Sequence, residues 1–208
     1  MKITEENLSN HNNFLRSKSP LEITQWAVKL AETPVVTTNF GPHSASMLNL
    51  VTQVKDDVKV IWCDTGYNTS YTYRYANEIS KKLNLNLFTY IPHQTSSQRD
   101  ALFGGIPTVE NPQHKIFTEQ VKLEPFRRAM KEHQPDVWFT NIRKGQTTFR
   151  DSLDILSLSK NGILKVSPFY YWSDEKLEAY LEKNNLPNEI KYFDPTKVLQ
   201  NRECGLHI

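Results

Sequence analysis

The sequence has only two cysteines, Cys63 and Cys204, among its 208 residues. Two cysteines do not make a disulfide framework, and reduced thiols are typical of a reducing compartment. An iron–sulfur cluster held by four cysteines needs more of them than the chain has. Cys204 and His207 have a C-x-x-H spacing, but no second Cys/His pair is present to complete a structural zinc site. We therefore expect no metal ion.

The sequence also lacks a large net charge and long apolar runs. The net charge is +2 and no block of five or six basic residues occurs, which argues against nucleic acid as a partner. No apolar run approaches the length of a membrane span, and the first ten residues lack the order of a signal peptide. We therefore expect a cytoplasmic protein of one domain that binds neither membrane nor nucleic acid.

Short β-branched runs alternate with helical stripes, a pattern typical of an α/β domain. We expect strands over residues 34–38, 58–62, 87–90, 137–140 and 163–166. Helices are predicted over 21–31, 47–54, 71–83 and 118–133, and after an N-cap at Ser173. Residues 92–117 are predicted to form a long loop. This order predicts a doubly wound, mostly parallel sheet whose ligands bind beyond the carboxyl ends of its strands.

Two predicted strand ends offer polar groups to a ligand. The first turn contains Thr38, Asn39, Phe40 and Gly41, where backbone N–H groups and a helix N-terminus would attract a phosphate. Any α/β protein needs such a turn, so a purely structural role stays open. Residues 64–66 (Asp-Thr-Gly) follow the second strand, where Asp64 or Thr65 either contacts a ligand or caps the next helix.

Basic residues gather near two further element ends, around Lys122 and in the segment from Arg143 to Arg150. The guanidinium fork matches phosphate and sulfate oxygens in pairs, so Arg143, just after a strand, indicates an anion site. Arg127 and Arg128 are better explained as a solvated helix face.

The second cysteine, Cys204, lies four residues from the C-terminus between Arg202 and His207. A cationic or imidazole neighbour lowers the pKa of a thiol and favours the nucleophilic thiolate. Taken alone, this pattern fits either an unremarkable chain end or a nucleophile on a movable arm.

Together these motifs resemble the sulfonucleotide reductases, in the same order over residues 34–208. The matching motifs are Thr-Asn-Phe-Gly at 38–41, Asp-Thr-Gly-Tyr at 64–67, Lys-Leu-Glu-Pro at 122–125, the run 138–150, and Glu-Cys-Gly-Leu-His at 203–207. The resemblance implies a PP-loop domain of the adenine nucleotide alpha-hydrolase type with a flexible C-terminal tail. It divides the chain into an N-terminal helical segment (1–31), a nucleotide-binding domain (32–184) and a tail carrying the catalytic cysteine (185–208).

The resemblance also implies roles for individual residues. Cys204 would attack the sulfate sulfur to give an S-sulfocysteine, from which thioredoxin or glutaredoxin releases sulfite, and His207 would bind substrate or favour the thiolate. Substrate-binding roles fall on Thr38, Asn39, Phe40, Gly41, Asp64, Thr65, Gly66, Lys122, Arg143, Gln146 and Arg150, whereas Glu124 would only position other groups. A homodimer is compatible with the resemblance.

Members of this family with an iron–sulfur cluster have a cysteine pair before the K-x-E-P motif, where this chain has Phe117 and Thr118. The resemblance therefore favours the cluster-free branch, whose substrate is 3′-phosphoadenylyl sulfate (PAPS). Adenylyl sulfate as substrate, an ATP-using PP-loop enzyme and a nucleotide-binding module are the alternatives. The chain departs from the family pattern at Asn39, at 70–71 and in a shortened stretch over 185–201.

Overall fold

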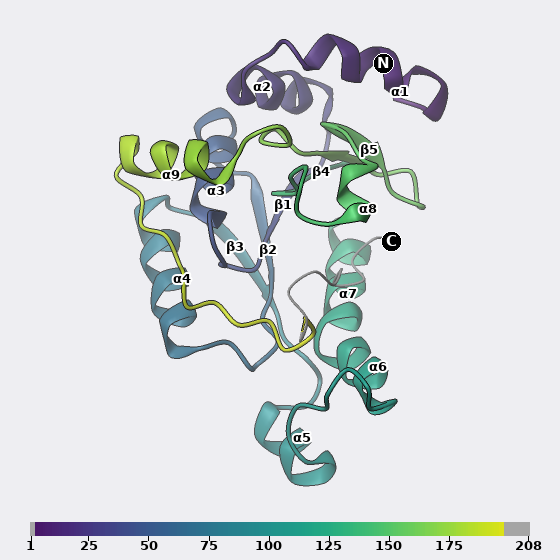
Figure 1. Ribbon diagram of the computed structural model, residues 1–208, viewed down its shortest axis with the longest axis vertical. Coiled ribbons are helices and arrows are strands. Elements are labelled where there is room, and N and C mark those ends of the chain that lie inside the picture. The colour runs from purple at the N-terminus through teal and green to yellow at the C-terminus, as the bar shows by residue number, and fades with distance from the viewer. Residues whose placement is uncertain (1–2, 198–208) are drawn as a thin grey trace.

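A six-stranded sheet forms the centre of the computed structural model, which describes residues 3–197 (Figure 1). The strand order is β3-β2-β1-β4-β6-β5, and only β5 runs antiparallel to its neighbour among the described strands. The strands are β1 (Pro34–Thr38), β2 (Lys59–Cys63), β3 (Asn86–Tyr90), β4 (Val137–Phe139), β5 (Leu156–Leu158) and β6 (Leu164–Val166). The predicted doubly wound, mostly parallel sheet is confirmed.

Helices precede, connect and follow these strands. They are α1 (Glu5–Leu15), α2 (Pro20–Leu30), α3 (Ser44–Val54), α4 (Ser70–Lys82), α5 (Ser96–Phe103), α6 (Gln113–Thr118), the π-helix η1 (Glu119–Leu123), α7 (Glu124–His133), α8 (Thr148–Asp151) and α9 (Asp174–Lys183). No helix within residues 3–197 combines the length and apolar character that crossing a bilayer needs.

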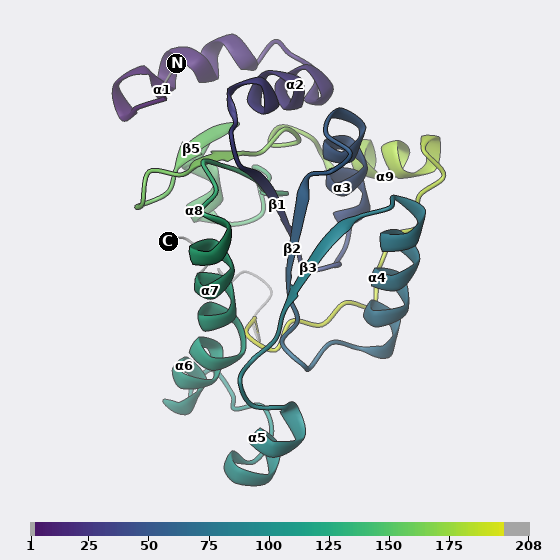
Figure 2. The same ribbon diagram turned by 180° about the vertical axis from the view of Figure 1, so that it is seen from behind.

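Helices cover both faces of the sheet. Neighbouring residues of a strand point to opposite faces, so each strand packs against helices on both sides. Val36 and Val60 pack in the larger core with residues of α3, α4 and α9, whereas Val35 and Ile61 pack with Phe126 of α7. Figures 1 and 2 show α3, α4 and α9 on one side of the sheet and α7 on the other. Because β1, β2, β3 and β4 run parallel to one another, the loops that follow them emerge at one edge of the sheet, the lower one in Figure 1.

The structure differs from the sequence-based prediction mainly in short elements. The predicted long loop over 92–117 contains α5 and most of α6, and the predicted helix over 118–133 starts as the π-helix η1. Neither α1, α8 nor β5 was predicted. α1 is rich in Asn and Glu, and α8 and β5 have four and three residues, too few for a periodic pattern to show.

Residues 185–197, named the crossing segment here, run from the end of α9 past α4 towards α7 across the lower edge (Figure 1). The Asn188 carboxamide oxygen accepts from the His43 N–H at 2.8 Å, and Asp194 forms an ion pair with Lys122. The predicted division at residues 32 and 185 stays a prediction. Cys204 and His207 lie outside the described residues.

Candidate active site

The predicted site residues gather where the parallel strands end. The chain passes from β1 outward to β2 and β3 and then returns to β4 on the other side of β1, so the strand order reverses between β1 and β4. Such a switch point leaves a crevice in which α/β proteins bind ligands. The loops that follow these two strands meet there, because the Asn141 side chain donates to the His43 carbonyl at 3.2 Å.

The loop after β1 is held by its own side chains. Thr38 Oγ1 accepts from the Phe40 N–H and Asn39 Oδ1 from the Gly41 N–H, each at 3.0 Å. Phe40 has a φ of 51° and is fully buried. Its ring meets that of Trp62 edge-on at 5.0 Å between centroids. An anion at this turn would therefore have to replace side-chain partners of the loop or use other donors.

Gly41 lies beneath the crossing segment. A Cβ atom at position 41 would be 3.1 Å from ring atoms of Tyr192 and 3.2 Å from Asn39 Oδ1. Real Cβ atoms rarely come so close to another heavy atom, so the ring and the loop backbone are in tight contact. The glycine is needed here for this close approach.

The loop after β2 is organised by Asp64. Its Oδ1 accepts from the Gly66 N–H at 2.9 Å, from Asn68 Nδ2 at 2.8 Å and from the Tyr73 hydroxyl at 2.9 Å. Gly66 has a φ of 78°, which glycine adopts without steric cost. The adjacent Thr65 is buried.

The N-cap of α4 is Thr69, whose side chain accepts from the Thr72 N–H at 3.1 Å. The structural alternative for residues 64–66, in which Asp64 or Thr65 caps this helix, is therefore wrong. These residues shape the loop instead.

Arg143, Gln146 and Arg150 belong to one short loop. Gln146 Oε1 accepts from the Arg143 backbone N–H at 2.9 Å and from Arg150 Nη1 at 2.5 Å. Thr147 caps the short helix α8, on which Arg150 lies. The structure thus brings three predicted residues together through a single carboxamide oxygen.

The Arg143 side chain is buried, and its Nη1 lies 2.5 Å from Asp174 Oδ1, in the first turn of α9. His43, 7% exposed, approaches the same carboxylate with Nδ1 at 3.6 Å and Glu178 with Nε2 at 3.9 Å. Burial, together with the Arg143 charge, lowers the pKa of His43 below its ordinary value, although Asp174 and Glu178 oppose this. The site therefore favours the neutral form of the His43 ring.

Lys122 lies on the other side of this edge, in the π-helix η1, and its side chain is buried. Its Nζ pairs with the Asp194 carboxylate and lies 3.3 Å from Thr196 Oγ1. Burial alone would raise the pKa of Asp194, but the Lys122 charge and the hydrogen bonds of Thr196 hold it below the ordinary value. Two predicted anion-binding cations, Lys122 and Arg143, are thus each paired with a carboxylate of the chain itself.

The nearby helix α7 carries the charges that were predicted to be structural. Glu124 accepts from Arg128 at 3.0 and 3.2 Å and lies 3.3 Å from His93 Nε2. Arg127 pairs with Glu119 on the surface. Arg127 thus fits the predicted solvated helix face, whereas Arg128 is half-buried and also donates to the Ile91 carbonyl at 2.7 Å.

Cys63 is the last residue of β2 and is half-buried. Desolvation raises the pKa of its thiol to about 12, although the charges of Lys122 and Arg128 act in the opposite direction. Cys63 is therefore a neutral thiol and a poor nucleophile at pH 7.

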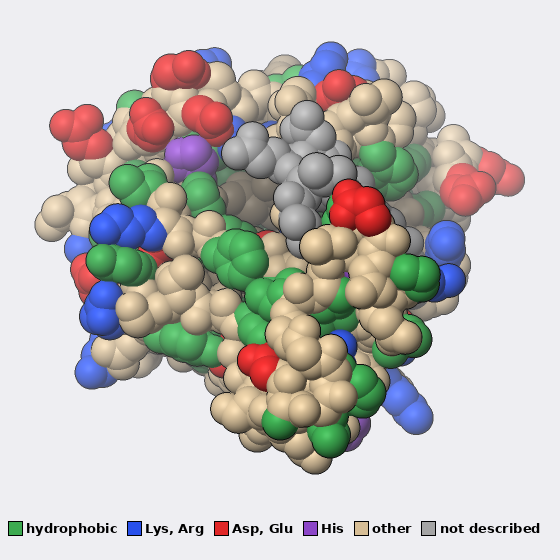
Figure 3. Space-filling view, turned by 60° about the horizontal axis from the view of Figure 1, so that its bottom comes forward, with side chains coloured by type: hydrophobic (Ala, Val, Ile, Leu, Met, Phe, Trp, Pro, Cys, Tyr) green, Lys and Arg blue, Asp and Glu red, His purple; other side chains and the backbone are tan. Residues whose placement is uncertain are grey.

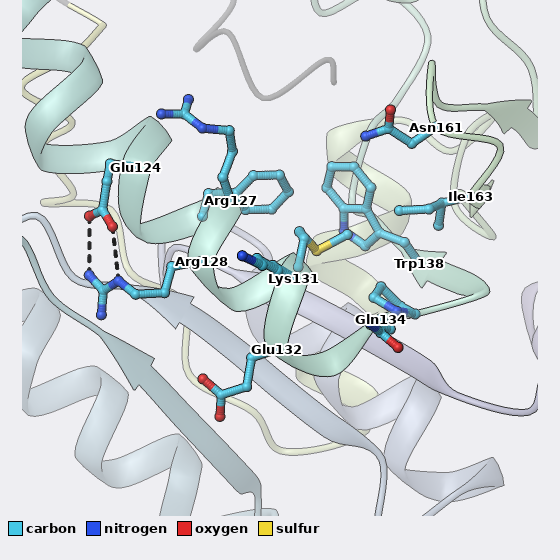
Figure 4. Close-up of a pocket in the computed structure, with 12 residues that line it drawn as sticks. Glu124, Arg127, Arg128, Lys131, Glu132, Gln134, Trp138, Asn161 and Ile163 are labelled. Atoms are coloured by element: carbon cyan, nitrogen blue, oxygen red, sulfur yellow. Dashed lines mark hydrogen bonds and ion pairs between the residues drawn. The ribbon is translucent and has the colours of Figure 1, made fainter.

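A cavity of about 1000 Å³ opens beside α7, and its lining includes Arg127 and Arg128 but not Lys122, Arg143 or Arg150 (Figure 4). Trp138, Ile163 and Met130 supply its apolar walls, and Glu124 alone of the predicted site residues lines it. The functional assignment therefore rests on the carboxyl edge of the sheet and not on this cavity. Figure 3 looks onto that edge and shows hydrophobic side chains gathered over its middle.

Several residues of this edge were not predicted: His43, Asp174, Asn188, Tyr192, Asp194 and Thr196. Asp194 Oδ1 accepts from the Thr196 N–H at 3.0 Å, so the local Asp-x-Thr pattern carried a recognisable turn signal. The partners of the other residues are far away in the sequence and left no local signal. Among residues 3–197, no group of three His, Cys, Asp or Glu side chains is arranged to hold a metal ion.

The chain is similar to known proteins over most of its length. Residues 33–193 match the family model described as "Phosphoadenosine phosphosulfate reductase domain". A phosphoadenosine 5′-phosphosulfate reductase of Vibrio atlanticus is 38% identical over 224 aligned residues, covering 94% of this chain and 84% of that protein. One from a Synechococcus strain is 34% identical, covering 86% and 78%.

Solved structures show the same fold. The phosphate complex of a phosphoadenylyl-sulfate reductase from Candida auris superposes with a TM-score of 0.80 at 24% identity, covering 91% of each chain. An NH3-dependent NAD synthetase from Campylobacter jejuni superposes with a TM-score of 0.55 at 15% identity, covering 84% of this chain and 74% of that one. The predicted adenine nucleotide alpha-hydrolase-like fold is thereby confirmed.

Proposed function

Because the chain belongs to the phosphoadenosine phosphosulfate reductase family, we propose that it reduces PAPS to sulfite and adenosine 3′,5′-bisphosphate at the carboxyl edge of its sheet. The observation that carries the proposal is the meeting of the loops after β1 and β4 at the switch point, with the buried Arg143 beside them. A loop with two arginines, Arg143 and Arg150, at such a crevice suits a substrate with several anionic groups.

The proposed chemistry begins with Cys204. Its thiolate attacks the sulfate sulfur, a sulfur–sulfur bond forms, and the bond from sulfur to the bridging phosphate oxygen breaks with its electron pair leaving on the nucleotide. A dithiol of the thioredoxin or glutaredoxin type then attacks Cys204 Sγ and sulfite departs with the electron pair. The second thiol of the donor closes its disulfide and frees Cys204, so the donor is oxidised by two electrons and the sulfate sulfur is reduced by two.

The basic residues have an electrostatic task in this proposal. A thiolate and a sulfated nucleotide repel each other, so fixed cations near the transferred group lower the barrier. Arg143 and Arg150 are held in one loop by Gln146. Asp174, with a side chain 63% exposed, is the partner of Arg143 that a substrate anion would displace. His207 is proposed to bind substrate or to favour the Cys204 thiolate as the tail closes.

The loop after β1 would contact the nucleotide through Thr38, Asn39, Phe40 and Gly41. The loop after β2 would do so through Asp64, Thr65 and Gly66. This proposal involves no iron–sulfur cluster, since the chain has two cysteines and such clusters use four. Cytoplasmic localisation is an expectation from the sequence, and a homodimer is compatible with the family resemblance.

Adenylyl sulfate is the alternative substrate, and an ATP-using enzyme or a nucleotide-binding module is the alternative function. ATP-using PP-loop enzymes would need a glycine-rich Ser-Gly-Gly-x-Asp-Ser loop, whereas residues 37–44 contain the single glycine Gly41. PAPS reduction therefore has the stronger support.

The test is a sulfite-release assay with PAPS and with adenylyl sulfate as parallel substrates, using reduced thioredoxin as donor. We expect release from PAPS, its loss in Cys204→Ser, and its retention in the matched variant Cys63→Ser. Mass spectrometry without donor should find one added SO3 group on Cys204. Activity retained by Cys204→Ser would refute the mechanism, and release from adenylyl sulfate alone would refute the proposed substrate.

A further inference from the structure

A buried ion pair joins the crossing segment to the body of the protein. Asp194 and Lys122 are 72 positions apart, and only 4% and 7% of their side-chain surfaces are exposed. Asp194 Oδ1 also accepts from the Thr196 N–H at 3.0 Å and from Thr196 Oγ1 at 2.7 Å. The carboxylate is thus held by its own turn while its other oxygen faces the ammonium group.

The position of Lys122 depends on this partner. Lys122 lies in the five-residue π-helix η1, an irregular turn of a kind that is frequent at functional sites. Lysine has a flexible four-carbon stem, so burial alone does not orient its ammonium group. The ion pair with Asp194 therefore orients the Lys122 ammonium group.

The pair Arg143–Asp174 offers a contrast within the same site. The Asp174 side chain is 63% exposed. Water can therefore solvate its carboxylate when a substrate anion takes its place beside Arg143. Asp194 has no such route to solvent, because its side chain is only 4% exposed and its Oδ1 is held by Thr196. A substrate anion can thus displace the Asp174 carboxylate from Arg143, whereas the Asp194 carboxylate stays paired with Lys122.

The crossing segment connects Lys122 to the loop after β1. The Asn188 side chain accepts from the His43 N–H, and the Tyr192 ring covers Gly41. A shift of Asp194 along this segment would therefore move Lys122 and the covering of the loop together.

We propose that Asp194 is a positioning residue of the reductase reaction, which holds the Lys122 ammonium group at the site and sets it in register with the loop after β1. The inference rests on the proposed function, in which Lys122 helps to hold the substrate anion. Asp194 itself touches no substrate in this proposal. Thr196 supports it by fixing the carboxylate.

The experiment compares Asp194→Asn, Lys122→Met and the double variant in sulfite release from PAPS, with kcat and KM determined separately. Breaking a hydrogen bond to a buried charge should lower kcat/KM at least about tenfold in each single variant. The double variant should be less than about twofold worse than Lys122→Met, because both changes remove the same cation from the site. The control is Asp57→Asn, which breaks the exposed pair with Lys55 and should leave kcat/KM unchanged.

A second readout does not depend on catalysis. In 1H–15N spectra of the full chain, the buried Lys122 ammonium group should give a protected signal that is lost in Asp194→Asn. If Asp194→Asn fails to fold, Thr196→Val replaces it and should weaken kcat/KM, while Thr196→Ser, which keeps the hydroxyl, should restore it.

The outcomes separate the two claims. Normal kcat/KM or an unchanged Lys122 signal in Asp194→Asn, or additive losses in the double variant, would overturn the positioning role even if Lys122→Met is impaired. An active Lys122→Met would instead show that Lys122 has no part in the proposed function. Wild-type protein that releases sulfite from neither nucleotide would refute the function itself, while the spectra would still report whether Asp194 holds Lys122.

Discussion

At the residue scale, the site is built from side chains whose ionisation is set by burial. His43 has a left-handed backbone with φ of 58° and a buried ring between Arg143 and the acidic residues Asp174 and Glu178. In its neutral form the His43 ring places no second positive charge beside Arg143. The cationic character of this side of the site therefore comes from arginine, whose charge does not change near pH 7.

The lowered pKa of His43 predicts an effect of pH on stability. The unfolded state takes up the proton at higher pH than the folded state, so this contribution is complete above the ordinary value of about 6.5 and is lost as the pH falls through the folded pKa. Urea unfolding of wild type and His43→Gln between about pH 5 and 8 measures it. Wild type should lose more free energy of unfolding towards low pH than the variant, and NMR should place the His43 midpoint below 6.5. A midpoint above 6.5 would contradict this.

At the element scale, α1 protects the edge strand β5. The Asn12 carboxamide accepts from the Leu156 N–H at 2.8 Å and donates to the Leu156 carbonyl at 3.0 Å. It thereby pairs backbone groups that an edge strand otherwise presents to other chains. The helix that the sequence failed to predict thus completes the sheet.

Asn12→Ala should therefore destabilise the protein by about 2 kcal/mol, since it leaves buried backbone groups of β5 without a partner. The matched variant Asn13→Ala changes an exposed residue of the same helix, which accepts only from Arg16 among the described contacts, and should stay within about 0.5 kcal/mol. Urea unfolding measures both. Equal changes in the two variants would show that the bridge to β5 adds no measurable stability, because the gain in helix propensity from Asn to Ala is common to both.

At the scale of the whole molecule, the crossing segment joins parts that are far apart in the sequence. Its residues contact the loop after β1 through Tyr192 and η1 through Asp194. Sheet edge, π-helix and crossing segment are therefore coupled, and a change in one should be felt in another.

Gly41→Ala tests this coupling. The added Cβ would press on the Tyr192 ring, so we expect a loss of about 1 to 2 kcal/mol in the free energy of unfolding. The loss should shrink in a Tyr192→Ala background and persist in Tyr192→Phe, which keeps the ring. Chemical denaturation of the single and double variants measures these terms. Equal losses in all three backgrounds would mean that the ring does not oppose the methyl group and that Asn39 Oδ1 does.

The alternation of strands and helices and the mostly parallel sheet could be predicted from the sequence, because both follow from local periodicity. It also indicated the loop of Arg143, Gln146 and Arg150, whose members are near neighbours in the chain. The pairing of Asp194 with Lys122 and the packing of Tyr192 on Gly41 became visible only in the folded chain. Those contacts depend on how a segment without regular structure crosses the sheet edge, and no local pattern of residues encodes a distant packing partner.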